Sequence, residues 1–529
     1  MRMNKWFQGL LLCGFVMLTA QPSVAQSRTK PNIIIILADD LGFSDLGCYG
    51  GEIATPNLDR LAANGVRFRQ FYNSAKCEPS RASLMSGQYW QTCGLGVKRG
   101  LTMGQAMQAS GYDTFAIGKW HLDGNPVARG FDHYFGHLGG ATDYFKGDKS
   151  HYLDDKPYRP ASDGKFYTTD ANADYAIKFI SEAHEKAPEK PFFMYLAFNA
   201  PHAPLQAWPE DIAKYRGKYR VGWDKLREQR YQKQLELGIT KKEWALSPRP
   251  ETIPAWETLT EEEKDFEDLR MSIYAAMVDR MDQAVGRVLA QVKAMGEEEN
   301  TLVVFLSDNG ASPYDHEKER SVASVLKGGW EYGLGWAHLS ETPFRHYKRN
   351  MGNGGSCTPC IASWPAVMQN PGSITDQRAH IIDLMATLMD AGGGTWPAEF
   401  AGQTLPPLPG KSLRPILAGE QRTPHEMLYF QLFDHRAVIS GEWKLVSDWG
   451  RPWELFNMAS DRTELNDLSK AQPEQLARLD KSWSDWAAKT GARLRAAGGE
   501  PIYRHLTDAR ENFVGGGADT ESKKPKKRH

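Results

Sequence analysis

NIIIILADD, at residues 32–40, determines the fold class of this chain. Its unbroken run of isoleucine and leucine is typical of a strand that is buried on both faces of a parallel sheet. The run ends at Asp39 and Asp40. Because ligands of such sheets bind outside the carboxyl ends of the strands, this acidic pair is the first candidate for functional residues.

The same pattern of a buried strand followed by polar residues recurs at residues 112–121, 191–202 and 301–310. Helical segments lie between these strands, and such alternation predicts an α/β fold. We expect a large mixed, mostly parallel sheet that helices cover on both faces. The polar residues at the strand ends should then meet at one edge of the sheet: Asp39, Asp40, Lys119, Trp120, His121, Asn199, His202, Asp308 and Asn309.

Two segments carry clear helical signals, and a third leaves two interpretations open. Residues 55–65 predict a helix with Thr55 as N-cap and Gly65 at its end, and residues 268–296 have helical periodicity. Residues 209–258 are polar and rich in lysine, arginine and tyrosine. We interpret them as a partly helical surface excursion, which either borders the site or is simply a solvated insertion.

The ends of the chain differ from its middle. Residues 1–25 predict a signal peptide, with basic residues before a short apolar stretch and small residues at a cleavage site. An uncleaved anchor is disfavoured because the stretch is too short to span a bilayer comfortably. We therefore expect an exported protein, periplasmic or secreted, without a stable membrane anchor.

The rest of the chain divides into a main domain and a smaller one. Residues 27–420 form the expected catalytic domain, and residues 421–498 the expected C-terminal subdomain. In the subdomain, alternating residues with turn glycines predict antiparallel hairpins, and residues 473–491 predict an amphipathic helix. Residues 499–529 are expected to be a disordered tail.

Composition excludes some classes of function. The chain has 529 residues, of which 41% are hydrophobic and 24% charged, so a large core is expected. A net charge of -1 gives no reason to expect a nucleic-acid partner. Cys357 and Cys360 form a Cys-x-x-Cys motif without a second one, which we interpret as two buried small residues or a local disulfide.

The side chains at the strand ends indicate a metal and an anionic substrate. Their carboxylates and amide offer only oxygen, which favours a hard divalent cation, Ca²⁺ or Mg²⁺, over zinc. Cations and histidines beside such an ion suit an anionic ester whose leaving oxygen must be protonated. The candidates for binding the anionic ester and for protonating its leaving oxygen are Lys119, His121, His202 and Lys348.

Several motifs resemble those of the type I, formylglycine-dependent sulfatases, within the alkaline-phosphatase-like superfamily. CEPSR at residues 77–81 matches their Cys-x-Pro-x-Arg signature, and GYDTFAIGKWH at residues 111–121 matches the second signature. LADD, NAPH, SDNG and TPFRHYKRNMGNGG follow in the family's order, and the resemblance runs from Pro31 to about Gly491. It implies an alkaline-phosphatase-like fold and a sulfuric ester hydrolase that acts on aryl or carbohydrate sulfates.

The resemblance also implies a role for each site residue. It implies Asp39, Asp40, Asp308 and Asn309 as metal ligands, with residue 77 as a further ligand and Ca²⁺ preferred to Mg²⁺. Arg81, Lys119 and His121 would support residue 77, with His121 as the proton acceptor. His202 and Lys348 would face the sulfate and its leaving group.

Cys77 itself would be converted to formylglycine (3-oxoalanine). A formylglycine-generating or sulfatase-maturating enzyme would read the signature in the unfolded chain. A hydroxyl group of the hydrated aldehyde, and not the cysteine thiol, would then attack the sulfur atom of the substrate. The implied substrate partner is a sulfated small molecule or glycan.

Two departures from the family pattern and two alternative functions stay open. Glu78 stands where the family usually has a small residue, and Asn353 stands where relatives often carry Glu. One alternative is a phosphonate or phosphodiester hydrolase on the same scaffold. The other is an inactive member that binds sulfated glycans, although all the expected polar positions are filled.

Overall fold

A computed structural model describes residues 30–494 of the chain, except for residues 162, 316–329, 449–450 and 493. The predicted signal peptide and the predicted tail therefore lie outside the described residues. Among the described helices, none has both the length and the apolar composition needed to cross a bilayer.

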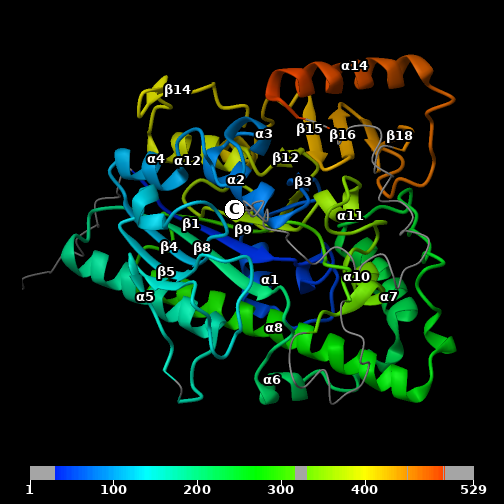
Figure 1. The fold of residues 1–529 in the computed structure, drawn as a ribbon, viewed down its shortest axis with the longest axis horizontal. Coiled ribbons are helices and arrows are strands. Elements are labelled where there is room, and N and C mark those ends of the chain that lie inside the picture. Colours follow the sequence, from blue (N-terminus) through cyan, green and yellow to red (C-terminus); the bar gives the residue numbers. More distant parts are fainter. Residues whose placement is uncertain (1–29, 162, 316–329, 449–450, 493, 495–529) are drawn as a thin grey trace, which may run out of the picture.

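A ten-stranded sheet forms the centre of the molecule (Figure 1). Its strands are β1 (Asn32–Asp39), β2 (Val66–Phe68), β4 (Asp113–Lys119), β5 (His133–His137), β6 (His151–Leu153), β7 (Lys156–Pro157), β8 (Phe192–Pro201), β9 (Thr301–Ser307), β10 (Cys360–Ser363) and β11 (Ser373–Thr375). They lie in the order β11-β2-β10-β9-β1-β8-β4-β5-β6-β7.

The strands near the middle of this sheet are parallel. β1 pairs in parallel with β8 and β9, and β4 does so with β8 and β5. Antiparallel pairs occur where β10 meets β9 and β2, and where β6 meets β5 and β7. The prediction of a mixed, mostly parallel sheet is thus confirmed.

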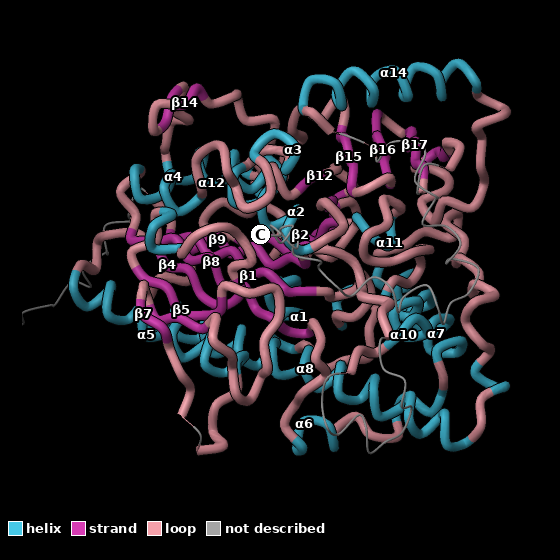
Figure 2. Tube along the Cα trace, viewed as in Figure 1, coloured by secondary structure: helices cyan, strands magenta, loops and turns pink. Residues whose placement is uncertain are grey.

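Helices cover both faces of the sheet, and the side chains of β1 alternate between the two cores. Ile34 and Ile36 pack in the core under the long helix α8 (Glu261–Ala294) and α5 (Thr168–Lys186). Ile33, Ile35 and Leu37 pack in the opposite core. Figure 2 shows these helices on the two sides of the strands, with α2 (Cys77–Ser86), α4 (Met103–Ala109) and α12 (Asp383–Gly392) on the second side.

Two predicted helices differ in detail from the sequence signals. α8 begins at Glu261, before the predicted start, because Thr260 and Glu263 form a reciprocal capping box there. α1 (Pro56–Ala63) has Thr55 at its N-cap as predicted, but the Thr55 hydroxyl binds elsewhere. It accepts from the Gly47 amide at 2.9 Å and donates to Asp59 at 3.1 Å.

The interpretation of residues 209–258 as a surface excursion is wrong for α7 (Trp223–Leu237). Arg227, Arg230 and Gln234 of this helix are buried. Arg230 binds Asp45 at 2.7 Å and Glu52 at 2.8 Å, so carboxylates of the main domain satisfy its charge. The polar composition of this segment indicated exposure to solvent, because arginine is rarely buried unless carboxylate partners surround it.

A second, smaller sheet lies near the C-terminal end of the described chain. It is antiparallel and consists of β15 (Leu428–Leu432), β16 (His435–Ser440), β17 (Trp443–Ser447) and β18 (Glu454–Asn457). α14 (Pro473–Thr490) lies over it and closes a separate core (Figure 1). The predicted antiparallel hairpins and amphipathic helix are confirmed.

Shorter elements connect these parts. They are η1 (Gly47–Tyr49), η2 (Pro126–Arg129), η3 (Lys218–Val221), η4 (Trp256–Thr258), α3 (Trp90–Cys93), α6 (Pro209–Ala213), α10 (Gly333–Ser340), α11 (Asn353–Ser356), α13 (Arg414–Leu417), β3 (Phe71–Tyr72), β12 (Ala379–His380), β13 (Glu399–Phe400) and β14 (Gln403–Thr404). The five cysteines of the described chain are buried and free, so the local disulfide between Cys357 and Cys360 does not form.

A buried ion pair of the C-terminal subdomain binds Asn353 of the main domain. The Lys444 ammonium lies 2.6 Å from Glu464 Oε1 and donates to Asn353 Oδ1 at 2.9 Å. The side chains of Lys444 and Glu464 are 0% and 1% exposed. The Asn353 backbone N–H donates to Glu464 Oε2 at 3.0 Å. Asn353, the neutral residue that departs from the family pattern, therefore binds Lys444 through its side chain and Glu464 through its backbone.

We expect Lys444→Met to lower the free energy of unfolding by about 3–5 kcal/mol, because it leaves the Glu464 charge buried without a partner. Urea unfolding followed by tryptophan fluorescence measures this. Lys470→Met, at an exposed position in the same subdomain, is the matched control. Adding Glu464→Gln to Lys444→Met should recover much of the loss. Equal stability of Lys444→Met and the parent would contradict a structural role for the pair.

Candidate active site

Polar residues from the ends of β1, β4, β8 and β9 meet at one edge of the large sheet, as predicted. Asp39 is the last residue of β1, and Lys119 is the last residue of β4. Their side chains form a buried ion pair. His202 and Asp308 directly follow β8 and β9. The strand order thus brings residues far apart in sequence to one place.

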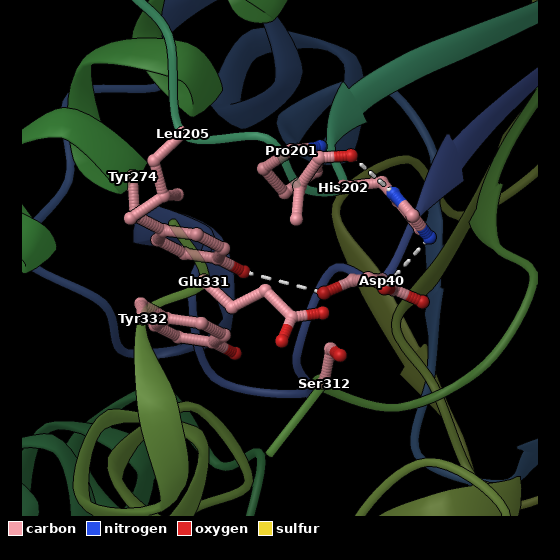
Figure 3. A pocket seen from close by; sticks show the side chains of 9 residues that line it. Asp40, Pro201, His202, Leu205, Tyr274, Ser312, Glu331 and Tyr332 are labelled. Atoms are coloured by element: carbon pink, nitrogen blue, oxygen red, sulfur yellow. Dashed lines mark hydrogen bonds and ion pairs between the residues drawn. The ribbon is translucent and has the colours of Figure 1, made fainter. Parts of the chain in front are cut away.

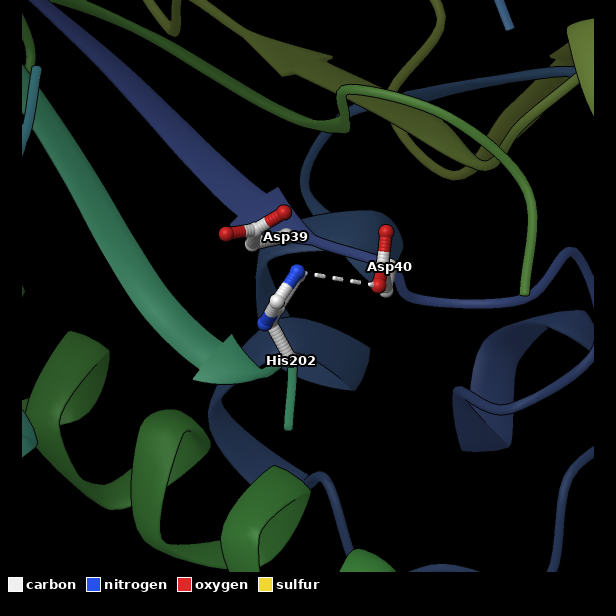
Figure 4. A group of neighbouring side chains, drawn as sticks. All are labelled: Asp39, Asp40 and His202. Atoms are coloured by element: carbon white, nitrogen blue, oxygen red, sulfur yellow. Dashed lines mark ion pairs between the residues drawn. The ribbon is translucent and has the colours of Figure 1, made fainter. Parts of the chain in front are cut away.

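Asp40 contacts several side chains of the site, and Figure 4 shows its contact with His202. Its Oδ1 accepts from the Lys348 ammonium at 2.6 Å and from the Asn309 amide at 2.6 Å. Its Oδ2 lies 3.6 Å from His202 Nε2. One ligand atom each from Asp39, Asp40 and His202 lies within 4.8 Å of the others, a spacing at which they could hold an ion.

Arg81 neutralises a second carboxylate of the site. It lies one turn after Cys77 on α2 and is fully buried. Its Nη2 and Nε donate to Asp308 Oδ2 at 2.9 and 3.0 Å. Its Nη1 donates to the Lys119 carbonyl at 2.9 Å, so Arg81 also fixes the end of β4.

Cys77 and His121 lie beside this network without a hydrogen bond to it. Cys77 is the first residue of α2 and is 4% exposed. The buried Nδ1 of His121 has no hydrogen-bond partner among the residues that the structure describes. The other predicted site residues form one connected set of contacts: Asp39, Asp40, Arg81, Lys119, His202, Asp308, Asn309 and Lys348.

Backbone strain is concentrated around these residues. Asp40, His121, Ala75, His346 and Arg349 are not glycines, yet they have φ angles of 65°, 53°, 56°, 68° and 75°. Such left-handed conformations cost about 1–3 kcal/mol each and persist where the surrounding structure enforces them. They lie next to, or within, the segments that carry the site side chains.

The carboxylates of the site compete for a limited amount of positive charge. Burial raises the pKa of a carboxyl group, but at Asp39 the charges of Lys119 and nearby cations outweigh burial and lower the pKa. At Asp308, burial and the charge of Asp39 raise the pKa well above its usual value. One more cation would allow both groups to ionise together.

Burial and the same cations set the protonation of the nearby groups. Burial and the charge of Lys119 hold the pKa of His121 well below its usual value, so its imidazole is neutral and able to accept a proton. Burial alone would raise the pKa of the Cys77 thiol, but Lys119 and Lys348 outweigh it and lower that pKa. Lys348 keeps its proton, because Asp40 raises its pKa despite burial.

The donor set fits a hard cation. Asp39 Oδ1, Asp40 Oδ2 and Asn309 Oδ1 are buried and have no hydrogen-bond donor in the described part of the chain. Unpaired buried oxygens are costly, and carboxylate and amide oxygens are the ligands that Ca²⁺ and Mg²⁺ take. These oxygens come from the ends of β1 and β9, where the sequence predicted the metal ligands.

A pocket borders the site, and sequence reasoning missed most of its lining (Figure 3). The rings of Tyr274 and Tyr332 stack with centroids 4.1 Å apart, and the Tyr274 hydroxyl donates to Asp45 at 2.7 Å. Tyr274 lies in the middle of α8, where periodicity indicates only a core position. The pocket is lined by Asp40, Pro201, His202, Ala203, Leu205, Tyr274, Ser312, Glu331 and Tyr332.

Known proteins that are similar to this chain include sulfatases. An arylsulfatase of Klebsiella aerogenes is 33% identical over 452 residues, covering 77% of this chain and 96% of the relative. An uncharacterised sulfatase of Schizosaccharomyces pombe is 31% identical over 533 residues, covering 88% and 95%. The structure of Ps i-CgsB in complex with k-i-k-neocarrahexaose superposes with a TM-score of 0.65 at 26% identity, covering 88% of this chain and 95% of that one.

The family comparison covers most of the chain. Residues 31–394, which hold every predicted site residue, match the sulfatase family. Sulfatases hydrolyse sulfate esters, and the predicted alkaline-phosphatase-like fold is confirmed by the solved relatives. The chain belongs to the sulfatase family and is a sulfatase enzyme.

Proposed function

We propose that this sulfatase cleaves sulfate monoesters with formylglycine at residue 77 and a divalent cation held at the ends of β1 and β9. The observation that carries the proposal is that one buried side-chain oxygen each of Asp39, Asp40 and Asn309 accepts no hydrogen bond from the described residues. These oxygens lie in the same site as Cys77, where burial raises the pKa of the thiol but the charges of Lys119 and Lys348 outweigh it and lower that pKa.

Asp39, Asp40, Asp308 and Asn309 would hold the cation, with residue 77 as a further ligand. Oxygen donors suit both Ca²⁺ and Mg²⁺, and we favour Ca²⁺ because Mg²⁺ demands stricter geometry and keeps more of its water. When bound, the cation supplies positive charge for the sulfate oxygens, and formylglycine supplies a hydrated aldehyde as the oxygen nucleophile. Fixed positive charge in a buried site stabilises the charge that develops there.

The side chains of the protein itself carry the proton transfers. His121 is neutral and accepts a proton from residue 77. Lys119 and Arg81 fix the surrounding carboxylates. Lys348 and His202 both contact Asp40. We assign Lys348 and His202 to contacts with the substrate's sulfate group and with its departing oxygen. His202 also meets the spacing of a metal ligand, but the oxygen donors suffice for a hard cation.

Relatives guide the choice of substrate. The arylsulfatase of Klebsiella aerogenes supports aryl sulfates, and the carbohydrate bound to Ps i-CgsB supports sulfated glycans. We further propose maturation by a formylglycine-generating or sulfatase-maturating enzyme, and export to the periplasm or medium. The chain would divide into a signal peptide at 1–25, a catalytic domain at 27–420, a subdomain at 421–498 and a tail at 499–529.

A phosphonate or phosphodiester hydrolase and an inactive glycan-binding protein are the rival functions. The named sulfatase relatives favour sulfate esters over both. Assaying nitrophenyl sulfate beside a nitrophenyl phosphodiester with the same preparation separates the three. We expect a higher kcat/KM for the sulfate; a higher value for the phosphodiester, or no turnover of either by the matured protein, would favour a rival.

We expect exhaustive chelation to abolish turnover and to lower Tm, because Asp39, Asp40 and Asp308 then repel one another and an anionic ester. Activity on nitrophenyl sulfate, differential scanning fluorimetry and elemental analysis measure this together. Ca²⁺ should restore both properties at lower concentration than Mg²⁺. Full activity and unchanged Tm in protein without bound metal would refute the cation site.

We expect mass spectrometry of the peptide containing residue 77 to show formylglycine, and Cys77→Ser to give at most about one turnover per enzyme. Serine offers one hydroxyl for attack but lacks the second hydroxyl that would release sulfate, so a sulfate ester should stay on residue 77. Rapid mixing and intact mass measure both effects. Cys93→Ser, at another buried cysteine, is the control. Sustained turnover by Cys77→Ser at near-parent rate would show that formylglycine is not needed.

We expect Lys348→Ala and His202→Ala to lower kcat/KM by at least about tenfold more for an alkyl or sugar sulfate than for nitrophenyl sulfate. Protonating the departing oxygen matters most when that oxygen is basic. Parallel assays on the two ester types measure the difference, with the exposed Lys470→Ala as control. Equal losses on both ester types would remove the leaving-group role from these residues.

A further inference from the structure

Lys76 and Arg349 bring two further cations to the site, and the chemistry above uses neither. Lys76 precedes Cys77, and Arg349 follows Lys348. The Arg349 amide N–H donates to the Ala75 carbonyl at 2.7 Å, so the two segments are tied together through their backbones. Ala75 and Arg349 both hold left-handed φ angles, 56° and 75°, which shows that the surrounding structure enforces this junction.

Both cations face the same aromatic ring. The Lys76 ammonium lies 5.7 Å from the ring centroid of Phe433, and the Arg349 guanidinium lies 5.9 Å from it. Phe433 stands in the turn between β15 and β16, so the C-terminal sheet reaches the site here. The Arg349 guanidinium also lies 4.9 Å from the ring of Tyr314. Cation–π contacts of this kind hold the two charges in place without neutralising them.

Neither cation has a carboxylate partner among the residues that the structure describes, whereas the other cations of the site do. Arg81, Lys119 and Lys348 each contact an aspartate. Within the described part of the chain, Arg349 and Lys76 form no ion pair, and the buried Nε of Arg349 has no hydrogen-bond acceptor. Glu78, the acidic residue beside Cys77, pairs with neither of them. Both side chains are half-buried, so the charges stay accessible at the border of the site.

We propose that Lys76, Arg349 and Phe433 form a subsite for a second anionic group on the alcohol part of the substrate. The preferred substrates would then be carbohydrate sulfates that carry a further sulfate or a carboxylate near the scissile ester. An arginine fork and a lysine ammonium bind either group by charge-assisted hydrogen bonds. This inference rests on the proposed function, because it needs the sulfate ester to lie between residue 77 and Lys348.

The test is competition by polyanions against hydrolysis of nitrophenyl sulfate, which carries no second charge. Dextran sulfate oligomers probe for a second sulfate, and oligogalacturonates probe for a carboxylate. We expect at least one of them to inhibit the parent, and Lys76→Met and Arg349→Met each to raise its half-inhibitory concentration about fivefold. The double variant should raise it further. Lys76→Arg keeps the charge and should stay near the parent, whereas Arg349→Lys keeps the charge but loses the fork and should fall between the parent and Arg349→Met.

Controls separate this inference from the proposed function. Lys470→Met removes an exposed charge elsewhere and should leave the inhibition unchanged. If the matured parent does not hydrolyse nitrophenyl sulfate, only the proposed function is refuted. The subsite can then still be tested, because calorimetry measures oligomer binding to the parent and to each variant without any turnover. If neither polymer binds the parent, or the Met variants bind both as tightly as the parent does, there is no such subsite.

Discussion

Charge balance among buried side chains at the carboxyl end of the central sheet is the constraint on which this site depends. Asp39, Asp40 and Asp308 are fully buried, and each contacts a buried cation. Removing charged groups from water is costly, so such a cluster persists only if partners surround it closely. Asp39 Oδ1, Asp40 Oδ2 and Asn309 Oδ1 accept no hydrogen bond from the described residues, and the proposed cation would bind these oxygens.

The fold supplies these partners from widely separated parts of the chain. Parallel pairing of β1 with β8 and β9 brings three strand ends together, and α2 adds Arg81 one turn after Cys77. The smaller sheet takes part as well. Asn353 of the main domain binds both members of its Lys444–Glu464 pair, and the sheet presents Phe433 to the cations beside the site. Catalysis and substrate selection can therefore depend on both sheets.

Sequence alone predicted the sheet and most of the site, because long apolar strands and the polar residues after them are local signals. It missed the burial of Arg230, because the partners Asp45 and Glu52 lie in a distant segment. It also missed Tyr274 in the pocket and the pairing of Phe433 with Lys76 and Arg349. Such contacts between side chains far apart in sequence leave no periodic pattern.

The cation site is the central claim, and a crystal structure of the matured protein grown with Ca²⁺ tests it most directly. We expect anomalous scattering from one cation, bounded by the oxygens of Asp39, Asp40 and Asn309 that accept no hydrogen bond. We also expect the Lys348 ammonium to move away from Asp40, whose charge the cation would share. Water in place of a cation at saturating Ca²⁺, with Lys348 still on Asp40, would refute the cation site.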